Sequence, residues 1–314
     1  MTTAFIFPGQ GSQAVGMGKS LADAFPAAKA VFDEIDHALS QKLSALMWDG
    51  PADELTLTAN AQPALMAVSL AAIRVLEAEA GLSLARDAAF VAGHSLGEYS
   101  ALAAAGSFSI ADAARLLRIR GDAMQQAVPA GEGAMAALLG ADLELASAIA
   151  GDAAQGQVCE VANDNGGGQV VLSGAKAAID RAIALSAERG VRRAMLLPVS
   201  APFHCALMAP AAQAMQAALA DVALNAPVVP VMANVGAAPL SDPDAIRASL
   251  VAQVTGTVRW RECVLAMAQA GVADFVEAGS GKVLAGLGKR IAPEARTLSV
   301  GSAGDIEGFK TRNG

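Results

Sequence analysis

Gly93-His94-Ser95-Leu96-Gly97 is the stretch that decides the fold of this 314-residue chain. An apolar run, Ala88 to Ala92, precedes it, and a segment with the apolar spacing of a helix, Leu96 to Ala103, follows it. In that strand–turn–helix context, G-x-S-x-G lifts a serine hydroxyl out at the end of a sheet, beside the free N–H groups of a helix. Glycine is common here, 31 of 314 residues, so the context more than the pattern predicts that Ser95 is a nucleophile for acyl transfer or hydrolysis.

The composition is that of an acidic protein with a large core. Hydrophobic residues make up 54% of the chain and charged residues 17%, which argues against disorder. The formal net charge of −8 excludes a general nucleic-acid-binding surface. The three cysteines are scattered and form no C-x-x-C, so neither a disulfide framework nor a metal site is predicted, and reduced thiols are typical of the cytoplasm.

Two segments bear on membranes and targeting. Met1 to Phe7 has no basic region and reads as a first strand, not as a signal peptide. Ala194 to Ala220 contains no Asp, Glu, Lys or Arg, but three prolines interrupt it, so it is not a membrane span. With the reduced thiols and the acidic charge, these segments lead us to expect a cytoplasmic protein that binds neither membrane nor nucleic acid. We also expect a monomer.

The chain has two styles of secondary structure. From residue 134 to residue 199 the pattern is β-α-β-β-α-β, the split ferredoxin-like arrangement. On either side of it strands and helices alternate, which predicts an α/β class with a mostly parallel sheet covered on both faces. We assign residues 1–128 and 199–314 to the catalytic domain and residues 129–198 to an inserted small subdomain. Other expected elements are helices at 22–39, at 61–80 with Pro63 in its first turn, at 110–127 and at 205–219, and a loose end at 301–314.

Three histidines are available as a base for Ser95. His37 lies in an acidic helical stretch and is expected at the surface. His94 adjoins the serine, and neighbouring side chains in a tight turn point apart, so we expect His94 to line the pocket. His204 stands at the start of a predicted helix, where the dipole disfavours imidazolium and keeps the base neutral. We favour His204 as the base over a buried structural histidine.

A third group should orient the base, and it is usually a carboxylate. No Asp or Glu stands out on a suitable loop of this sequence. A backbone carbonyl and a side-chain amide both remain open as the orienting group.

Arg120 is a charged residue on an apolar stripe. In the helix predicted from Ile110, it shares a face with Leu116, Leu117 and Met124. A buried guanidinium needs an anionic partner because its unpaired burial is very costly. Two roles stay open here: a structural ion pair with a core acid, and a fork that binds a substrate carboxylate with two hydrogen bonds.

Gly9 to Ala14 fits the dinucleotide fingerprint G-x-G-x-x-G/A. Acidic residues follow at Asp33 and Glu34, near the expected offset. That acid should end a second strand, whereas Val31 to Leu39 has the spacing of a helix. We therefore favour another use of the glycine-rich loop, in which it offers a backbone N–H group to an oxyanion.

Five motifs together resemble the malonyl-CoA:acyl-carrier-protein transacylase family, the acyltransferases of type II fatty-acid synthesis. The resemblance covers about Thr3 to Pro293, with the motifs in the family's order. It implies an α/β-hydrolase-like core with an inserted ferredoxin-like subdomain, in agreement with the segmentation above. The motifs are FPGQGSQ at 7–13, GHSLGEYSAL at 93–102, the arginine of RIRGDAM at 118–124, PFH at 202–204 and GKVLAGLGKR at 281–290.

The resemblance also implies the roles of the reacting groups. Ser95 would carry malonyl as an ester, and His204 would act as general base and then as general acid. Gln253 matches the family position whose backbone carbonyl orients the histidine. After that position the family usually reads Asn-Pro-Val, whereas this chain has Thr255-Gly256-Thr257-Val258, which we expect to loosen the loop.

Further residues would bind the substrate. By the resemblance, Arg120 would clamp the malonyl carboxylate, and the N–H groups of Gln10 and Leu96 would form the oxyanion hole. Asn163 falls on a family asparagine near the pocket. Phe203, beside the base, is expected to crowd a branched acyl group such as methylmalonyl. Together with His94, these residues complete the predicted substrate site.

The implied reaction is a ping-pong transfer without metal or other cofactor. Malonyl-CoA would acylate the serine, and the phosphopantetheine thiol of an acidic acyl-carrier protein would then take the malonyl group. Docking of that partner requires a local basic patch on this acidic chain. The candidates are Arg189, Arg192 and Arg193 on the small subdomain, and Lys282, Lys289 and Arg290 on the large domain.

Two other functions remain as alternatives. A serine esterase or thioesterase would use the same Ser95 and His204, with water in place of the thiol. A non-catalytic acyl-binding scaffold would need neither residue. Arg120 favours the transferase, since a simple esterase has no use for a buried cation.

Overall fold

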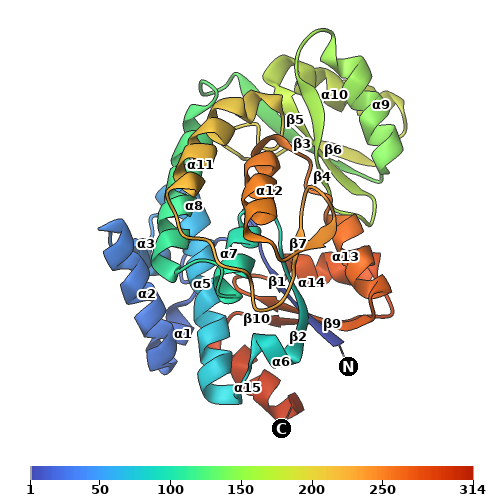
Figure 1. The fold of residues 1–314 in the computed structure, drawn as a ribbon. Helices are drawn as coiled ribbons and strands as arrows, with labels where there is room; N and C mark the ends of the chain where they lie inside the picture. Colours follow the sequence, from blue (N-terminus) through green and yellow to red (C-terminus); the bar gives the residue numbers. More distant parts are fainter. Residues whose placement is uncertain (1, 314) are drawn as a thin grey trace.

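The larger part of the molecule is built on a six-stranded sheet in the order β10-β9-β1-β2-β7-β8 (Figure 1). The computed structural model describes residues 2–313. All neighbouring strands of this sheet are parallel except β8, which is antiparallel to β7. The expected α/β class with a mostly parallel sheet is confirmed. The strands are β1 (Thr2–Phe7), β2 (Ala88–Gly93), β7 (Val231–Ala233), β8 (Ala238–Leu240), β9 (Val272–Ala278) and β10 (Arg296–Val300).

Helices cover both faces of this sheet, and the alternation of side chains along β1 explains why. Phe5 and Phe7 point into the core cluster that contains α5, α7 and α8, whereas Ala4 and Ile6 point into the cluster that contains α13 and α14. The helices of this part are α1 (Lys19–Ala24), α2 (Pro26–Leu39), α3 (Leu43–Asp49), α4 (Ala52–Thr56), α5 (Thr58–Ala80), α6 (Leu84–Asp87), α7 (Gly97–Ala104), α8 (Ile110–Gln126), α11 (Ala209–Ala220), α12 (Pro243–Thr255), α13 (Trp260–Gln269), α14 (Val283–Ile291) and α15 (Ala303–Asn313), with a short 3-10 helix, η1 (Ala206–Met208).

Helix α5 is the central helix of the main core. Among residues 2–313 it is the one helix long and apolar enough to cross a membrane by length and composition, and 83% of its most apolar window is buried inside the protein. Burial on this scale is typical of a core helix. The helix begins at Thr58, so Pro63 lies inside it and not in its first turn as we expected.

A second, four-stranded sheet lies above the carboxyl ends of the main strands (Figure 1). Its order is β4-β5-β3-β6 and every neighbouring pair is antiparallel. The expected β-α-β-β-α-β order is present. The elements are β3 (Gly133–Leu139), α9 (Leu143–Ala154), β4 (Cys159–Asp164), β5 (Gln169–Ala175), α10 (Lys176–Glu188) and β6 (Arg193–Leu196).

This small sheet has a core of its own on one face. Ala136 and Leu138 pack with α9 and α10, while Met135 and Ala137 on the other face of β3 join the main core. On this ground we keep the proposal that residues 129–198 form a subdomain inserted between residues 1–128 and 199–314.

Two expected elements are wrong. The helix expected at 22–39 is two helices, because Phe25 is extended (φ −130°) and Pro26 begins α2, where a missing N–H costs no helical hydrogen bond. The expected loose end contains α15, preceded by β10. Ile306 of α15 is fully buried against the main core, and Phe309 packs partly buried against the same cluster. Two apolar residues leave little periodic signal in the sequence.

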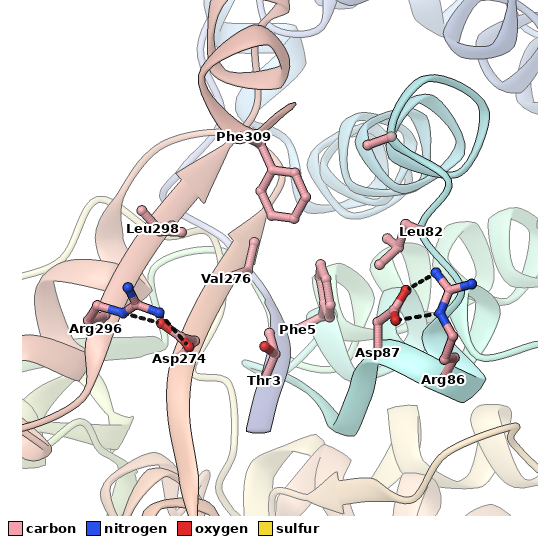
Figure 2. A pocket seen from close by; sticks show the side chains of 11 residues that line it. Thr3, Phe5, Leu82, Arg86, Asp87, Asp274, Val276, Arg296, Leu298 and Phe309 are labelled. Atoms are coloured by element: carbon pink, nitrogen blue, oxygen red, sulfur yellow. Dashed lines mark hydrogen bonds and ion pairs between the residues drawn. The ribbon is translucent and has the colours of Figure 1, made fainter. Parts of the chain in front are cut away.

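A cavity of about 510 Å³ opens where β1 and β9 begin (Figure 2). Two ion pairs flank it, Arg86 with Asp87 and Arg296 with Asp274, around an apolar floor that includes Phe5. Since the strands are parallel, this end of the sheet is opposite the end at which β2 leads into Ser95. The candidate active site therefore lies elsewhere.

Candidate active site

Ser95 occupies a sharp turn between β2 and α7. Its φ of 53° lies in the left-handed region, which residues other than glycine adopt only under strain. Glycine is required on both sides for steric reasons. A Cβ on Gly93 would lie 1.9 Å from the carbonyl oxygen of Gly97, and one on Gly97 would lie 2.3 Å from that of Phe7. The turn is thus pressed against the end of β1 and holds the Ser95 hydroxyl at the edge of the sheet.

His204 is in contact with the Ser95 hydroxyl. Its Nε2 lies 2.8 Å from Ser95 Oγ, and its Nδ1 donates to the backbone carbonyl of Gln253 at 2.8 Å. A carbonyl only accepts hydrogen bonds, so Nδ1 carries the proton and Nε2 is left free to accept one from the serine. Of the two groups left open to orient the base, the structure brings the backbone carbonyl to the ring.

The reason expected for a neutral His204 is wrong. The residue does not start a helix: η1 begins at Ala206 and α11 only at Ala209, where Pro210 stands in the first turn. His204 itself is buried and has a φ of 58°. Burial, and after it the positive charge of Arg120, lower the pKa of His204 to about 3. The ring is therefore a neutral proton acceptor near pH 7.

Arg120 of α8 projects into the same site, and it is 1% exposed. Its Nη2 donates to Ser95 Oγ at 3.1 Å and to Oε1 of Gln253 at 2.9 Å, and its Nη1 donates to Oε1 of Gln62 at 2.8 Å. Within residues 2–313 no acid lies within ion-pair distance of Arg120, although the buried Glu98 is near enough to interact with it electrostatically, and Nε of Arg120 has no hydrogen-bond partner. The hydrogen bonds of this buried cation all go to neutral oxygens, which favours a substrate anion over a structural ion pair.

Backbone N–H groups lie beside the nucleophile. Leu96 is the residue before α7, and Gln10 is in the loop after β1 that lines the same cavity as Ser95. In the described part of the chain, neither N–H donates a hydrogen bond to another residue. Gly9 lets this loop approach, because a Cβ there would lie 2.7 Å from the carbonyl oxygen of His94. The two N–H groups are available to a negative oxygen.

The remaining predicted residues line a cavity of about 520 Å³ around Ser95. Nε2 of His94 lies 2.9 Å from Oδ1 of Asn165, so His94 is held away from the serine hydroxyl. Asn163 and Phe203 are both 7% exposed and line the cavity, as expected. Apolar side chains fill much of the remaining wall: Met124, Met135, Val171, Leu197 and Val199.

The segment after Gln253 is fastened to the small subdomain. Thr257 Oγ1 donates to the carbonyl of Val161 at 2.6 Å, and the Val258 N–H donates to that of Ala162 at 2.8 Å. In return the Asp164 N–H donates to the carbonyl of Val258 at 3.0 Å. The expectation that the sequence after Gln253 loosens this loop is therefore wrong, because hydrogen bonds hold the loop to β4.

Three residues that contact the site were missed from the sequence. Gln62 accepts from Arg120, and Glu98 accepts from Gln253. The side chain of Asn234 binds the backbone N–H of Ser95 and the backbone carbonyl of Gly93. Glu98 carried a signal, since it is an acid within an otherwise apolar helix next to the nucleophile. Asn234 follows a short apolar strand and has no comparable pattern.

Comparisons with known proteins agree on one family. Residues 4–297 match the model of the acyl transferase domain. The chain is 45% identical over 305 residues to a malonyl CoA-acyl carrier protein transacylase of Bacillus subtilis (strain 168), covering 97% of this chain and 95% of that protein. It is 56% identical to the crystal structure of an acyl-carrier-protein S-malonyltransferase from Bartonella henselae, with a TM-score of 0.97 and coverage of 100% and 99%. A third similar structure is a malonyl-transacylase in complex with a type II PKS acyl-carrier protein, at 40% identity, a TM-score of 0.96 and coverage of 99% and 100%.

Proposed function

This chain belongs to the acyl transferase domain family, among the malonyl CoA-acyl carrier protein transacylases, and on that premise we propose a ping-pong mechanism through a malonyl ester of Ser95. The enzyme is an acyltransferase. In the proposed reaction it takes malonyl from malonyl-CoA and passes it to the phosphopantetheine thiol of an acyl-carrier protein. The observation that carries the proposal is that Ser95 Oγ lies 2.8 Å from a neutral base and 3.1 Å from a buried guanidinium.

In the first half-reaction His204 Nε2 takes the proton of Ser95 as Oγ attacks the thioester carbonyl carbon. The carbonyl oxygen becomes negative and accepts from the N–H groups of Gln10 and Leu96. The C–S bond then breaks, and the imidazolium gives its proton to the leaving sulfur of CoA. The serine is left as a malonyl ester, and the base is neutral again.

The second half-reaction runs the same steps with the carrier-protein thiol as nucleophile. His204 takes the thiol proton, sulfur attacks the ester carbonyl, and the C–O bond to Ser95 breaks as the proton returns to Oγ. No proton is lost or gained overall. The backbone carbonyl of Gln253 holds the ring in the same tautomer throughout, since it accepts from Nδ1.

Arg120 supplies the specificity in this proposal. The free carboxylate of a malonyl group on Ser95 would form a stronger, charge-assisted pair with the guanidinium, beside the two glutamine oxygens that already accept from it. The Nε of Arg120 has no hydrogen-bond partner, so it can donate a second hydrogen bond to the carboxylate and make the contact bidentate. An acetyl group would leave the cation unpaired.

We place the carrier protein over α14. Val283 and Leu284 of this helix line the cavity that contains Ser95. Lys282 directly precedes the helix, and Lys289 and Arg290 lie in its last turn. Both Lys289 and Arg290 are exposed. In the other candidate cluster, Arg189 already pairs with Asp152. An acidic partner on α14 would bring its thiol to the mouth of the cavity.

One experiment separates transfer from hydrolysis. The enzyme is mixed with labelled malonyl-CoA, with and without a carrier protein bearing phosphopantetheine, and label is followed into carrier protein and into free malonate. We expect transfer to exceed malonate release by at least about a hundredfold, because the phosphopantetheine thiol, and not water, is the acceptor that the enzyme selects. Release of malonate at the same rate with and without the carrier protein would assign the chain to the thioesterases instead.

A further inference from the structure

Glu98 is a buried carboxyl group beside the site that the proposed mechanism does not use. It lies in the first turn of α7 and is 1% exposed. One oxygen, Oε2, accepts from the backbone N–H of Asn234 at 3.0 Å and from Nε2 of Gln253 at 2.9 Å. The other oxygen, Oε1, has no hydrogen-bond partner among the described residues. A buried acid with all of its contacts on one oxygen calls for an explanation.

Gln253 connects this acid to three parts of the site. Its backbone carbonyl accepts from His204, and its side-chain oxygen accepts from Nη2 of Arg120 at 2.9 Å. Its side-chain nitrogen donates to the carbonyl of Ser95 at 3.0 Å as well as to Glu98. One fully buried residue therefore contacts the base, the guanidinium and the nucleophile.

The direction of the Gln253 amide matters because its two ends have opposite roles. A guanidinium only donates hydrogen bonds, so the amide oxygen must face Arg120. If the amide turned over, its NH2 group would meet the cation donor to donor. On the other side, Glu98 Oε2 and the Ser95 carbonyl accept only from the NH2 group. These two acceptors select the orientation that turns the oxygen toward Arg120.

Glu98 is also tied to the nucleophile turn through Asn234. The Asn234 side chain accepts from the Ser95 N–H at 2.8 Å and donates to the Gly93 carbonyl at 2.7 Å. The backbone N–H of the same residue donates to Glu98. The acceptor oxygen of Glu98 is thus fixed relative to the strained turn that carries Ser95.

We propose that Glu98 is a positioning residue for acyl-group selectivity: through its hydrogen bond to Gln253 it turns the amide oxygen toward Arg120 and fixes the guanidinium to receive a carboxylate. The inference rests on the proposed function. It requires the acceptor oxygen and not the charge. Burial raises the pKa of Glu98 to about 7, and a proton on the unpartnered Oε1 leaves Oε2 an acceptor.

Three substitutions test this role. Glu98→Asp keeps the charge but withdraws the acceptor by one methylene, Glu98→Leu removes the acceptor, and Glu98→Gln keeps an acceptor without the charge. The readout is the ratio of serine acylation by malonyl-CoA to that by acetyl-CoA, each as kcat/KM in rapid-quench experiments. We expect Glu98→Asp and Glu98→Leu to lower the ratio at least about tenfold, mainly by raising KM for malonyl-CoA, and Glu98→Gln to keep it within about threefold.

A general loss of structure would lower both rates together and leave the ratio unchanged. An unchanged ratio in Glu98→Asp, or a ratio lowered as far in Glu98→Gln, overturns the proposal. Should Glu98→Leu fail to fold, the Asp and Gln variants still decide it. A double-mutant cycle adds a second measurement: Glu98→Asp should have no more than about a twofold further effect in a Gln253→Leu background, whereas additive effects would contradict it. Failure of the proposed function itself is distinct, because the unmodified enzyme would then not be acylated by malonyl-CoA.

Discussion

The Nδ1 atom of His204 donates a hydrogen bond to the backbone carbonyl of Gln253 at 2.8 Å. In a Ser-His-Asp triad this place belongs to a carboxylate, which stabilises the imidazolium that forms during catalysis. A neutral carbonyl orients the ring but stabilises the charged form less. Burial, and after it the positive charge of Arg120, lower the pKa of His204 to about 3, although the Gln253 carbonyl acts in the opposite direction.

The pH dependence of acylation follows from this pKa. A group whose pKa is lowered to about 3 stays unprotonated, and therefore active as a base, until the pH falls through that value. We expect kcat/KM for malonyl-CoA to change less than about threefold between pH 8 and pH 5, where a histidine of ordinary pKa, near 6.5, would lose about thirtyfold. Circular dichroism at each pH checks that the fold is intact. An acid limb near pH 6.5 that persists in Glu98→Gln, which lacks the nearby carboxyl of pKa about 7, would show that His204 is not held neutral.

Arg120 is expected to decide which acyl group is accepted. Arg120→Ala should raise the activation free energy of acylation by malonyl-CoA by about 2–4 kcal/mol, which lowers kcat/KM roughly 30- to 1000-fold. The rate with acetyl-CoA relative to that with malonyl-CoA should rise. Arg120→Lys is the matched control, since it keeps a charge but not the two-pronged fork, and should be intermediate. If Arg120→Ala used malonyl-CoA as well as the parent and did not gain on acetyl-CoA, Arg120 would not be the clamp.

The glycine after the nucleophile should be essential for folding. A Cβ on Gly97 would lie 2.3 Å from the carbonyl oxygen of Phe7, a backbone atom of β1 that cannot move aside. We expect Gly97→Ala to lower the free energy of unfolding by more than about 3 kcal/mol in urea titrations. Gly286→Ala is the control: its Cβ meets nothing within 4 Å, and alanine favours the helix, so stability should be unchanged or rise by up to about 1 kcal/mol. Equal midpoints for the two variants would refute the steric account of the turn.

Reversing the charge of basic residues should show where the carrier protein binds. Lys289→Glu with Arg290→Glu is expected to lower kcat/KM for the carrier protein about tenfold and to weaken its salt dependence, since rim charges act mainly on association. Acylation by malonyl-pantetheine, a donor without phosphates, should not change. Arg192→Glu with Arg193→Glu on the small subdomain is the matched control and should have little effect. A loss of activity with the carrier protein in the Arg192/Arg193 variant, and not in the Lys289/Arg290 variant, would show that the carrier protein binds the small subdomain.

The sequence predicted the parts of the site that depend on local pattern. The strand–turn–helix around Ser95 and the apolar stripe that buries Arg120 are periodic features, and both are present in the structure. The alternation of strands and helices likewise predicted the sheet. Each of these features follows from the order and spacing of apolar residues along the chain.

Features that depend on distant contacts were missed or misjudged. His204 is neutral because it is buried near Arg120, 84 positions away in the sequence, and not because it begins a helix. Asn234, the residue after the neighbouring strand β7, holds the Ser95 turn at a separation of 139 residues. The part played by Gln253 came only from the family resemblance, since its backbone carbonyl carries no sequence signal. Tertiary neighbours of this kind leave no local pattern.

The most direct test of the account is to locate the acyl group on the enzyme. The protein is mixed with malonyl-CoA in the absence of carrier protein, quenched within a second in acid, digested and mapped by mass spectrometry. We expect one malonyl group on the peptide that contains Ser95, its loss in Ser95→Ala, and its quantitative removal when carrier protein is added before the quench. Malonyl transfer to carrier protein without a modified Ser95, or an equal yield of modification in Ser95→Ala, would contradict the central claim that this serine holds malonate between two thiols.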